Sequence, residues 1–183
     1  MTSDLVTPSD VISFWREAGP DRWWKKDSSF DDTIRTRFLA TWEAARDGKL
    51  ASWQESDDGA LALVIVLDQF PRNMFRNDPK MFSTDAKAVD VAARAIAEGR
   101  DARTPKDLLA FLYMPYMHTE TREGQARCME LFTKLGDPFN LKFAKEHADI
   151  IERFGRFPHR NATLGRTTTP EEAKFLADGG FAG

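Results

Sequence analysis

Polar side chains that could bind an anion gather in two short segments of this chain. Phe-Pro-Arg-Asn at 70–73 is echoed by Phe-Pro-His-Arg-Asn at 157–161, and each follows a predicted helix. The stretch 153–166 around the second motif holds four arginines and a histidine but no acidic residue, although the whole chain carries a net charge of −3. Guanidinium groups bind carboxylates and phosphates through paired hydrogen bonds. The pattern therefore predicts a local anion-binding pocket.

The expected roles divide between holding an anion and moving protons. We expect a ligand to be held by Asp68, Gln69, Arg72, Asn73, His147, Arg153, Arg156, Arg160, Asn161 and Arg166. The predicted catalytic residues are His118, Glu120 and His159. Imidazole changes its protonation near neutral pH, so His118, His159 or His147 would transfer protons. Glu120 or Asp68 would orient the imidazole.

Two other interpretations of the same residues stay open. The arginines could pair with Asp68, Glu120 or Glu152 and hold a loop between helices, because structural ion-pair networks resemble binding sites. A metal could instead be held by nitrogen and oxygen ligands from His118, Glu120, His147 and Asp68. Neither the HExxH nor the CxxC spacing occurs, so we predict no metal and no cofactor.

Other site chemistries have little support. Cys128 lies beside Met129 and Leu131 on an amphipathic segment, which indicates packing rather than nucleophilic catalysis. The Gly-x-Ser-x-Gly elbow and the glycine patterns of nucleotide-binding loops do not occur. The five tryptophans are expected mainly in the core, with Trp23 and Trp24 as the candidates for exposure.

Composition limits the partners and the compartment. A net charge of −3 and a pI near 5.7 argue against nucleic acid or an anionic membrane surface as partners. The N-terminus lacks the features of a secretory signal. The longest apolar run, 60–67, is far shorter than the roughly 20 residues that cross a bilayer. With a single cysteine, these features favour the cytoplasm.

Start and stop signals predict about eight helices in one domain over 1–183. Threonine or aspartate before proline marks several starts, and glycine marks several ends. The predicted helices run from 8 to 19, 29 to 48, 59 to 70, 83 to 99, 104 to 115, 120 to 135, 137 to 154 and from 169 onward. Asp57 or Asp58 is expected to cap the third, and Pro115 to kink or end the fifth. A buried strand is the alternative for 60–67.

Short connections between these helices predict an all-α stack of antiparallel helical hairpins. No regular 34-residue repeat is present, so the stack would be a degenerate, tetratricopeptide-like one.

Rare motifs along nearly the whole chain resemble one known family. They include Trp-Trp-Lys-Lys-Asp at 23–27, Leu-Asp-Gln-Phe-Pro-Arg-Asn at 67–73, Phe-Leu-Tyr-Met-Pro at 111–115, His-Thr-Glu at 118–120, and Arg-Phe-Gly-Arg-Phe-Pro-His-Arg-Asn at 153–161. In order and spacing they resemble the uncharacterised domain-of-unknown-function 924 family, from about Val11 to Gly180. That family usually has serine where this chain has Thr119, which keeps the hydroxyl. The resemblance implies an all-α, tetratricopeptide-like fold and no established activity.

The sequence thus favours a helical protein whose polar pocket binds a small anionic metabolite, with hydrolase or transferase activity as a further expectation. The alternative is a scaffold that binds a peptide or protein partner without catalysis, since helical-hairpin stacks present concave surfaces to partners.

Overall fold

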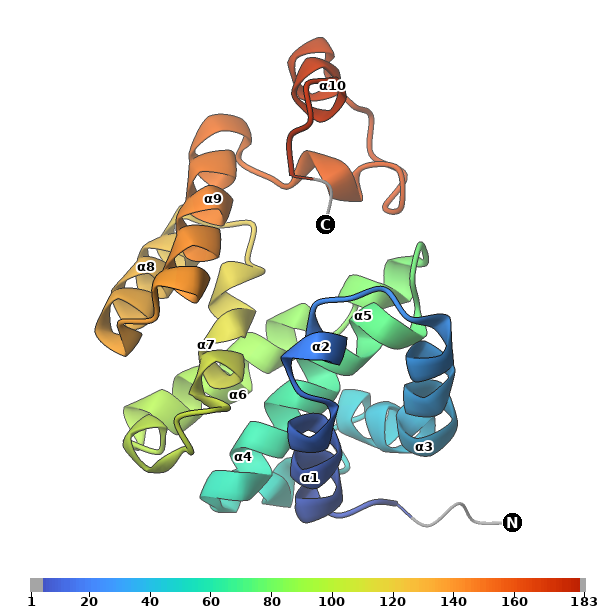
Figure 1. The fold of residues 1–183 in the computed structure, drawn as a ribbon, viewed down its shortest axis with the longest axis vertical. Coiled ribbons are helices and arrows are strands. Elements are labelled where there is room, and N and C mark those ends of the chain that lie inside the picture. The colour runs from blue at the N-terminus through green and yellow to red at the C-terminus, as the bar shows by residue number, and fades with distance from the viewer. Residues whose placement is uncertain (1–4, 182–183) are drawn as a thin grey trace. The chain divides into compact units, whose positions relative to one another are not determined.

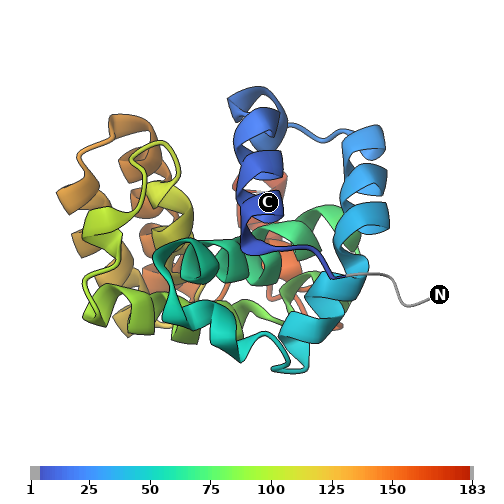
Figure 2. The same cartoon turned by 90° about the horizontal axis from the view of Figure 1, so that it is seen from below.

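The computed structural model describes residues 5–181, and within that range it contains helices and connecting segments but no strand. The predicted all-α fold is therefore confirmed. The described residues form two compact units (Figures 1 and 2). The N-terminal unit comprises 5–76 and 80–115, and the C-terminal unit comprises 77–79 and 116–181. The prediction of a single domain stays a prediction. Within 5–181, no helix combines the length and the apolar character needed to cross a membrane.

The N-terminal unit is organised around a helix that is apolar on every side. Its helices are α1 (Pro8–Ala18), α2 (Pro20–Trp23), α3 (Ser28–Arg46), α4 (Asp57–Val64), α5 (Phe70–Met74), α6 (Asp85–Ala97) and most of α7 (Leu109–Met117). From Gly59 to Val64 every residue of α4 is buried. It packs against α1 and α6, while α3 packs against α5. A helix without a polar face is stable only when neighbours cover it on all sides.

Aromatic side chains fill this core, as the composition predicts. Phe38 and Phe70 have ring centroids 4.6 Å apart, and Trp15 lies 5.7 Å from Phe70 and 5.4 Å from Phe111. Trp15 is 1% exposed, whereas Trp24 is 45% exposed. Trp42 is buried as well, whereas Trp23 and Trp53 are half-buried. Of the two candidates for exposure, Trp24 is exposed, and two of the five tryptophans lie fully in the core.

The segment 59–70 is helical, so the strand alternative for 60–67 is wrong. α4 continues directly into a π-helix, Ile65–Gln69, in which the N–H of Phe70 donates to the carbonyl of Ile65, and then into α5. The predicted cap is also corrected. Ser56, not Asp57 or Asp58, caps α4, because its hydroxyl accepts the N–H of Gly59 at 3.0 Å. Asp57 instead pairs with Arg100 and Arg103.

Replacing this cap gives a first prediction. Ser56→Ala is expected to lower the free energy of unfolding by about 1 kcal/mol, because the N-terminus of α4 loses the acceptor for one of its N–H groups that have no partner within the helix. Urea unfolding followed by circular dichroism measures the change. Asp58→Ala, at the exposed neighbouring position, is the control and should change stability by less than about 0.5 kcal/mol. A larger loss in the Asp58 variant would contradict the assignment.

The fifth predicted helix is shifted along the chain. α7 begins at Leu109 rather than at Pro105, because the N–H groups of Leu108 and Phe111 bond three residues back in turns. Pro115 does not end it, and the helix runs two residues further to Met117. Proline there lacks the N–H that would bond the carbonyl of Phe111.

The C-terminal unit is built on a helical hairpin. α8 (Arg122–Leu135) and α9 (Pro138–Phe154) lie side by side (Figure 1), joined by Gly136 and Asp137. Gly136 has φ +74°, the left-handed conformation that ends α8, and the Asp137 carboxylate accepts the N–H groups of Phe139 and Asn140 to start α9. The short helix α10 (Pro170–Ala177) opens with a capping box formed by Thr169 and Glu172.

Candidate functional site

The predicted site residues fall into both units. Asp68, Gln69, Arg72 and Asn73 lie in the N-terminal unit, and all the others lie in the C-terminal unit. Each group is described by itself.

In the N-terminal unit, a buried carboxylate is surrounded by its own donors. Asp68 is fully buried, and its carboxylate accepts the side-chain amide of Gln69 at 2.7 Å. Arg72 donates to the carbonyl of Asp68 at 2.6 Å and to both carboxylate oxygens of Asp85 at 2.8 and 3.0 Å. Burial opposes the charge of Arg72, but Asp85 and Asp68 outweigh it and raise the pKa of the guanidinium. The positive charge predicted to attract a ligand is thus matched inside the unit.

Asn73 belongs to a neighbouring network. Its amide donates to Asp31 at 2.7 Å, and Asp31 also pairs with Arg76. Asp31 lies on α3, so this network ties α3 to α5. The π-helix before α5 was not foreseen from the sequence. Such turns are rare and occur frequently at functional positions.

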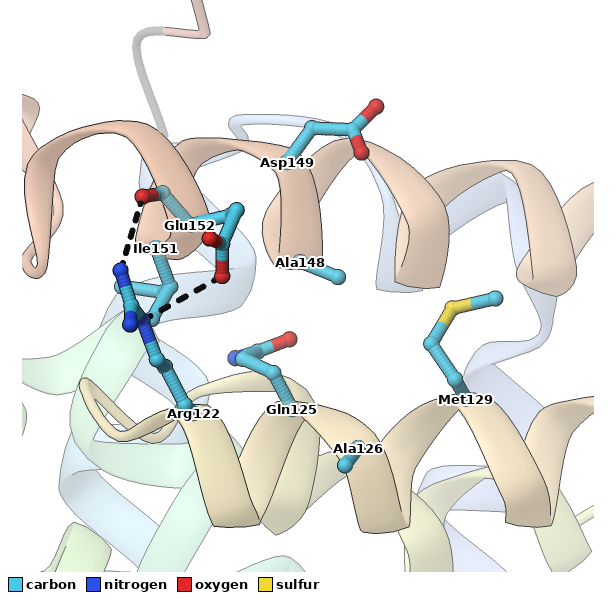
Figure 3. A pocket seen from close by; sticks show the side chains of 8 residues that line it. All are labelled: Arg122, Gln125, Ala126, Met129, Ala148, Asp149, Ile151 and Glu152. Atoms are coloured by element: carbon cyan, nitrogen blue, oxygen red, sulfur yellow. Dashed lines mark hydrogen bonds and ion pairs between the residues drawn. The ribbon is translucent and has the colours of Figure 1, made fainter.

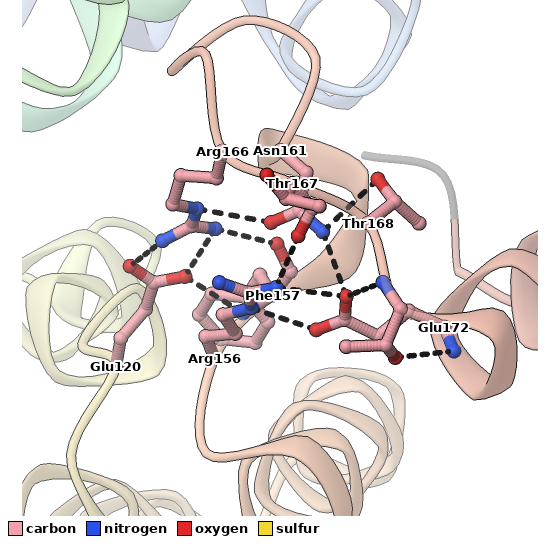
Figure 4. Close-up of polar contacts among 9 residues, drawn as sticks. Glu120, Arg156, Phe157, Asn161, Arg166, Thr167, Thr168 and Glu172 are labelled. Atoms are coloured by element: carbon pink, nitrogen blue, oxygen red, sulfur yellow. Dashed lines mark hydrogen bonds and ion pairs between the residues drawn. The ribbon is translucent and has the colours of Figure 1, made fainter.

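In the C-terminal unit, Glu120 and Arg166 form a two-pronged ion pair (Figure 4). Nη1 of Arg166 lies 2.9 Å from Oε2 of Glu120, and Nη2 lies 3.0 Å from Oε1. Glu120 also accepts the N–H of Phe157 at 2.7 Å. Burial tends to raise the pKa of Glu120, but Arg166 and this N–H outweigh it, so the pKa is lowered. A carboxylate held in this way is a weak proton acceptor at neutral pH.

A second glutamate is more deeply buried. Glu172, 3% exposed, binds Arg156 through both oxygens at 2.7 and 2.9 Å and accepts the amide of Asn161 at 3.0 Å (Figure 4). The hydrogen bond from Arg156 lowers the pKa of Glu172 to about 2. At the surface, Arg153 pairs with Glu171 at 3.0 Å.

Arg153, Arg156 and Arg166 therefore pair with Glu171, Glu172 and Glu120. Glu120 was foreseen as such a partner, but Glu152 pairs with Arg122 instead. Glu171 and Glu172, both from α10, were missed as partners. The capping box at 169–172 was the available signal, because it places a glutamate close to the backbone that follows the arginine loop.

Arg160 and all three histidines of the chain belong to another group, which we call the histidine cluster. It consists of His118, His147, His159, Arg160, Phe157 and Phe181. His147, on α9, is 6% exposed, and its ring lies 6.4 Å from that of His118 and 4.6 Å from that of Phe181. His159 lies 5.2 Å from Phe181. Arg160 stacks over Phe157 at 4.7 Å and donates to the carbonyl of His118 at 3.0 Å.

His147 has a defined protonation state. Its Nδ1 lies 2.8 Å from the carbonyl oxygen of Phe143, and a carbonyl only accepts, so Nδ1 carries the proton. Burial, followed by the charge of His118, lowers the pKa of His147 to about 3. The ring is therefore neutral at pH 7 and its Nε2 keeps a lone pair. His159 and Arg160 act on this pKa in the same direction as His118. Arg160 also lies near Glu120, whose pKa it helps to lower.

Within residues 5–181, no group of three or more histidine, cysteine, aspartate or glutamate side chains has an arrangement that could hold a metal ion. Cys128 is buried, and burial raises the pKa of its thiol to about 12.

Comparison with known proteins identifies the family. Residues 11–180 match the family described as "Bacterial protein of unknown function (DUF924)". The chain belongs to this family. A solved structure of a protein of unknown function, ATU0120 from Agrobacterium tumefaciens, is 44% identical to this DUF924 protein, with a TM-score of 0.91. The match covers 93% of this chain and 97% of that one. The search of curated proteins found no match.

The resemblance noted in the motifs is thus confirmed as DUF924 membership. The comparisons give this DUF924 protein a family and a fold. They do not assign a reaction, so any function has to be argued from the side chains themselves.

Proposed function

We propose that this DUF924 protein binds a small anion carrying a carboxylate or phosphate group at the histidine cluster. The observation that carries the proposal is the meeting of three imidazoles and a guanidinium: the ring of His147 lies 6.4 Å from that of His118, and Arg160 donates to the carbonyl of His118 at 3.0 Å. An anion beside these groups gains Coulomb energy that is less screened than at the surface, because His147 and Arg160 are both buried. The chain is acidic overall, so this gathering of all its imidazoles beside a guanidinium is a local feature.

The two aromatic rings favour a small ligand. Phe157 is fully buried and lies 5.4 Å from His147, and Phe181 contacts both His147 and His159. Apolar walls reduce the hydration of the polar groups between them and strengthen each hydrogen bond to a ligand. Binding pockets commonly combine such walls with a few convergent polar groups.

The cluster also bears on the predicted hydrolase or transferase activity. With a pKa of about 3, His147 is, like Glu120, a weak proton acceptor at neutral pH, so its neutral Nε2 would accept a hydrogen bond from a hydroxyl or a water molecule and orient it. In this proposal His147 positions that group, His118 or His159 transfers the proton, and Glu120 positions the loop through Arg166 and the N–H of Phe157. That differs from the sequence-based assignment of Glu120 as a catalytic residue.

Arg160→Gln tests the anion site. Calorimetric titration with inorganic phosphate and with succinate is expected to show binding to the native protein, weakened about 10- to 100-fold by the substitution, the range for a lost hydrogen bond to a charged group. His159→Gln, at a less buried position, should weaken binding in the same direction.

Arg153→Gln is the matched control, because Arg153 is exposed and already paired with Glu171. It should bind the anions as the native protein does. Equal binding by the Arg160 and Arg153 variants, or no binding by the native protein, would reject the anion site. The peptide-binding scaffold inferred as an alternative from the sequence would then be the better hypothesis.

A further inference from the structure

A buried hydrogen-bond acceptor lies between α8 and α9 without a donor. Gln125, on α8, is 3% exposed. Its Nε2 donates to the carbonyls of Met117 at 2.9 Å and Thr119 at 2.8 Å, with a longer contact of 3.4 Å to the carbonyl of Tyr116. Its Oε1 is also buried, and no donor within the described residues reaches it.

The orientation of this amide is determined by its surroundings. Exchanging the oxygen and nitrogen of Gln125 would place Oε1 against three carbonyl oxygens, which cannot donate. Nε2 must therefore face the end of α7, and Oε1 must face the other way. A buried acceptor left without a donor costs about 1–3 kcal/mol, so a partner supplied from outside the chain would gain this energy.

Gln125 lines a groove between the two helices. The groove has a volume of about 250 Å³ and is lined by Arg122, Gln125, Ala126, Met129, Ala148, Asp149, Ile151 and Glu152. Figure 3 shows the amide of Gln125 extending from α8 toward α9, with Ala126 and Ala148 as small side chains on the two facing helices. The volume is several times the roughly 30 Å³ that one water molecule occupies in the liquid, so a short aliphatic molecule fits.

The charges on the groove favour a cation. Arg122 on α8 pairs with Glu152 on α9 at 3.3 Å, which neutralises one end (Figure 3). Asp149 adds a second carboxylate to the lining, and no ion pair to it is found within 5–181. The side chains that line the groove therefore include two carboxylates and one guanidinium, which gives the lining a net negative charge.

We propose that the groove between α8 and α9 binds the ammonium group of a small primary aliphatic amine. An N–H of the ammonium donates to Oε1 of Gln125, the alkyl chain packs against Ala126, Met129 and Ala148, and Asp149 attracts the positive charge. The site takes a ligand of opposite charge to that of the histidine cluster and uses different side chains, so either proposal can fail without the other.

A titration with butylammonium, followed by the NMR signals of the Gln125 side-chain amide, tests the proposal. We expect saturable shifts with a dissociation constant on the order of 1 mM, reasonable for so small a ligand. Two comparison probes separate the contributions. Tetramethylammonium has the charge without an N–H, and 1-butanol has a donor without the charge, so each should bind at least about 5-fold more weakly, a loss of about 1 kcal/mol.

Variants of the groove complete the test. Ala148→Leu fills the space and leaves the Gln125 amide in the chain, so it should weaken butylammonium binding more than 10-fold, by about 1.4 kcal/mol or more. Ala126→Leu on the facing helix should act similarly. Asp149→Asn should weaken binding about 3-fold, as for an exposed charge worth less than 1 kcal/mol.

Glu146→Gln on the same helix, outside the groove and near Lys142, should change nothing. Absence of a saturable shift with butylammonium would overturn the proposal. So would equal binding of tetramethylammonium, or unchanged butylammonium binding in both alanine-to-leucine variants.

Discussion

Acidification from pH 7 to pH 5 is expected to destabilise this DUF924 protein by about 2 kcal/mol through His147 alone. In the folded chain burial holds the pKa of His147 near 3, whereas in the unfolded chain it returns to its ordinary value of about 6.5. Between these two values the unfolded state binds a proton that the folded state does not. Stability from this residue is therefore complete above about pH 6.5 and decreases as the pH falls toward 3.

Urea unfolding at several pH values between 7 and 5 measures this effect. His147→Asn removes the titrating group. Between pH 7 and pH 5, the free energy of unfolding of this variant should therefore decrease by about 2 kcal/mol less than that of the native protein. The groups facing His147 are the carbonyl of Phe143, His118, His159 and Arg160, and they are present in both proteins. The difference between the two proteins therefore isolates His147. Parallel pH profiles would show that its ring is not held neutral by the fold.

Glu172→Ala is expected to lower the free energy of unfolding by about 3 kcal/mol. Glu172 is almost fully buried and receives hydrogen bonds from Arg156, Asn161 and the N–H of Thr169. Removing its carboxylate leaves these donors without their acceptor and leaves the charge of Arg156 unbalanced. The cost of breaking a buried pair by removing one partner exceeds the net contribution of the pair itself.

Glu171→Ala provides a closely matched control. Glu171 is adjacent in the same turn of α10 and pairs with Arg153, but both side chains are more than half exposed. Exposed pairs contribute less than about 1 kcal/mol, so this variant should unfold almost as the native protein does. Thermal and urea unfolding of both variants make the comparison. Equal losses in the two variants would contradict the structural role given to Glu172.

The contacts of Glu172 also indicate how α10 is attached. Phe175 on α10 lies 5.1 Å from Phe154 at the end of α9, so the helix has an apolar contact in addition to its ion pairs. Phe157 belongs to the same apolar group as Ile150 and Ile151. The loop between α9 and α10 thus has an apolar side, and its arginines bind the glutamates of α10 and Glu120.

Helix starts and ends that depend on residues close by in the chain could be predicted from the sequence. Thr7 before Pro8, Asp137 before Pro138 and Thr169 before Pro170 each cap a helix as predicted. Gly136 and Gly155 end α8 and α9 in the left-handed conformation. Caps and stops are interactions within about four residues, so residue type and spacing are enough to predict them.

Helix starts and ends that depend on contacts between residues far apart in the chain could not be predicted from the sequence. Asp57 has the right residue type to cap α4, but it pairs with Arg100 and Arg103, and Ser56 takes the role. The π-helix Ile65–Gln69 has no sequence signal in a continuous apolar run. These choices follow from which side chains meet in three dimensions, because packing outweighs weak local preferences.

The sequence by itself determined the all-α fold, most helix ends, family membership, and the residue types available for a site. Only the tertiary structure decided which charges are matched. The arginines of 153–166 have no acidic residue among them in the sequence, which suggests an anion pocket. In the structure, Arg166, Arg153 and Arg156 pair with Glu120, Glu171 and Glu172. The physical reason is that Coulomb energy and hydrogen bonding depend on distance in space, to which the separation of residues along the chain is a poor guide.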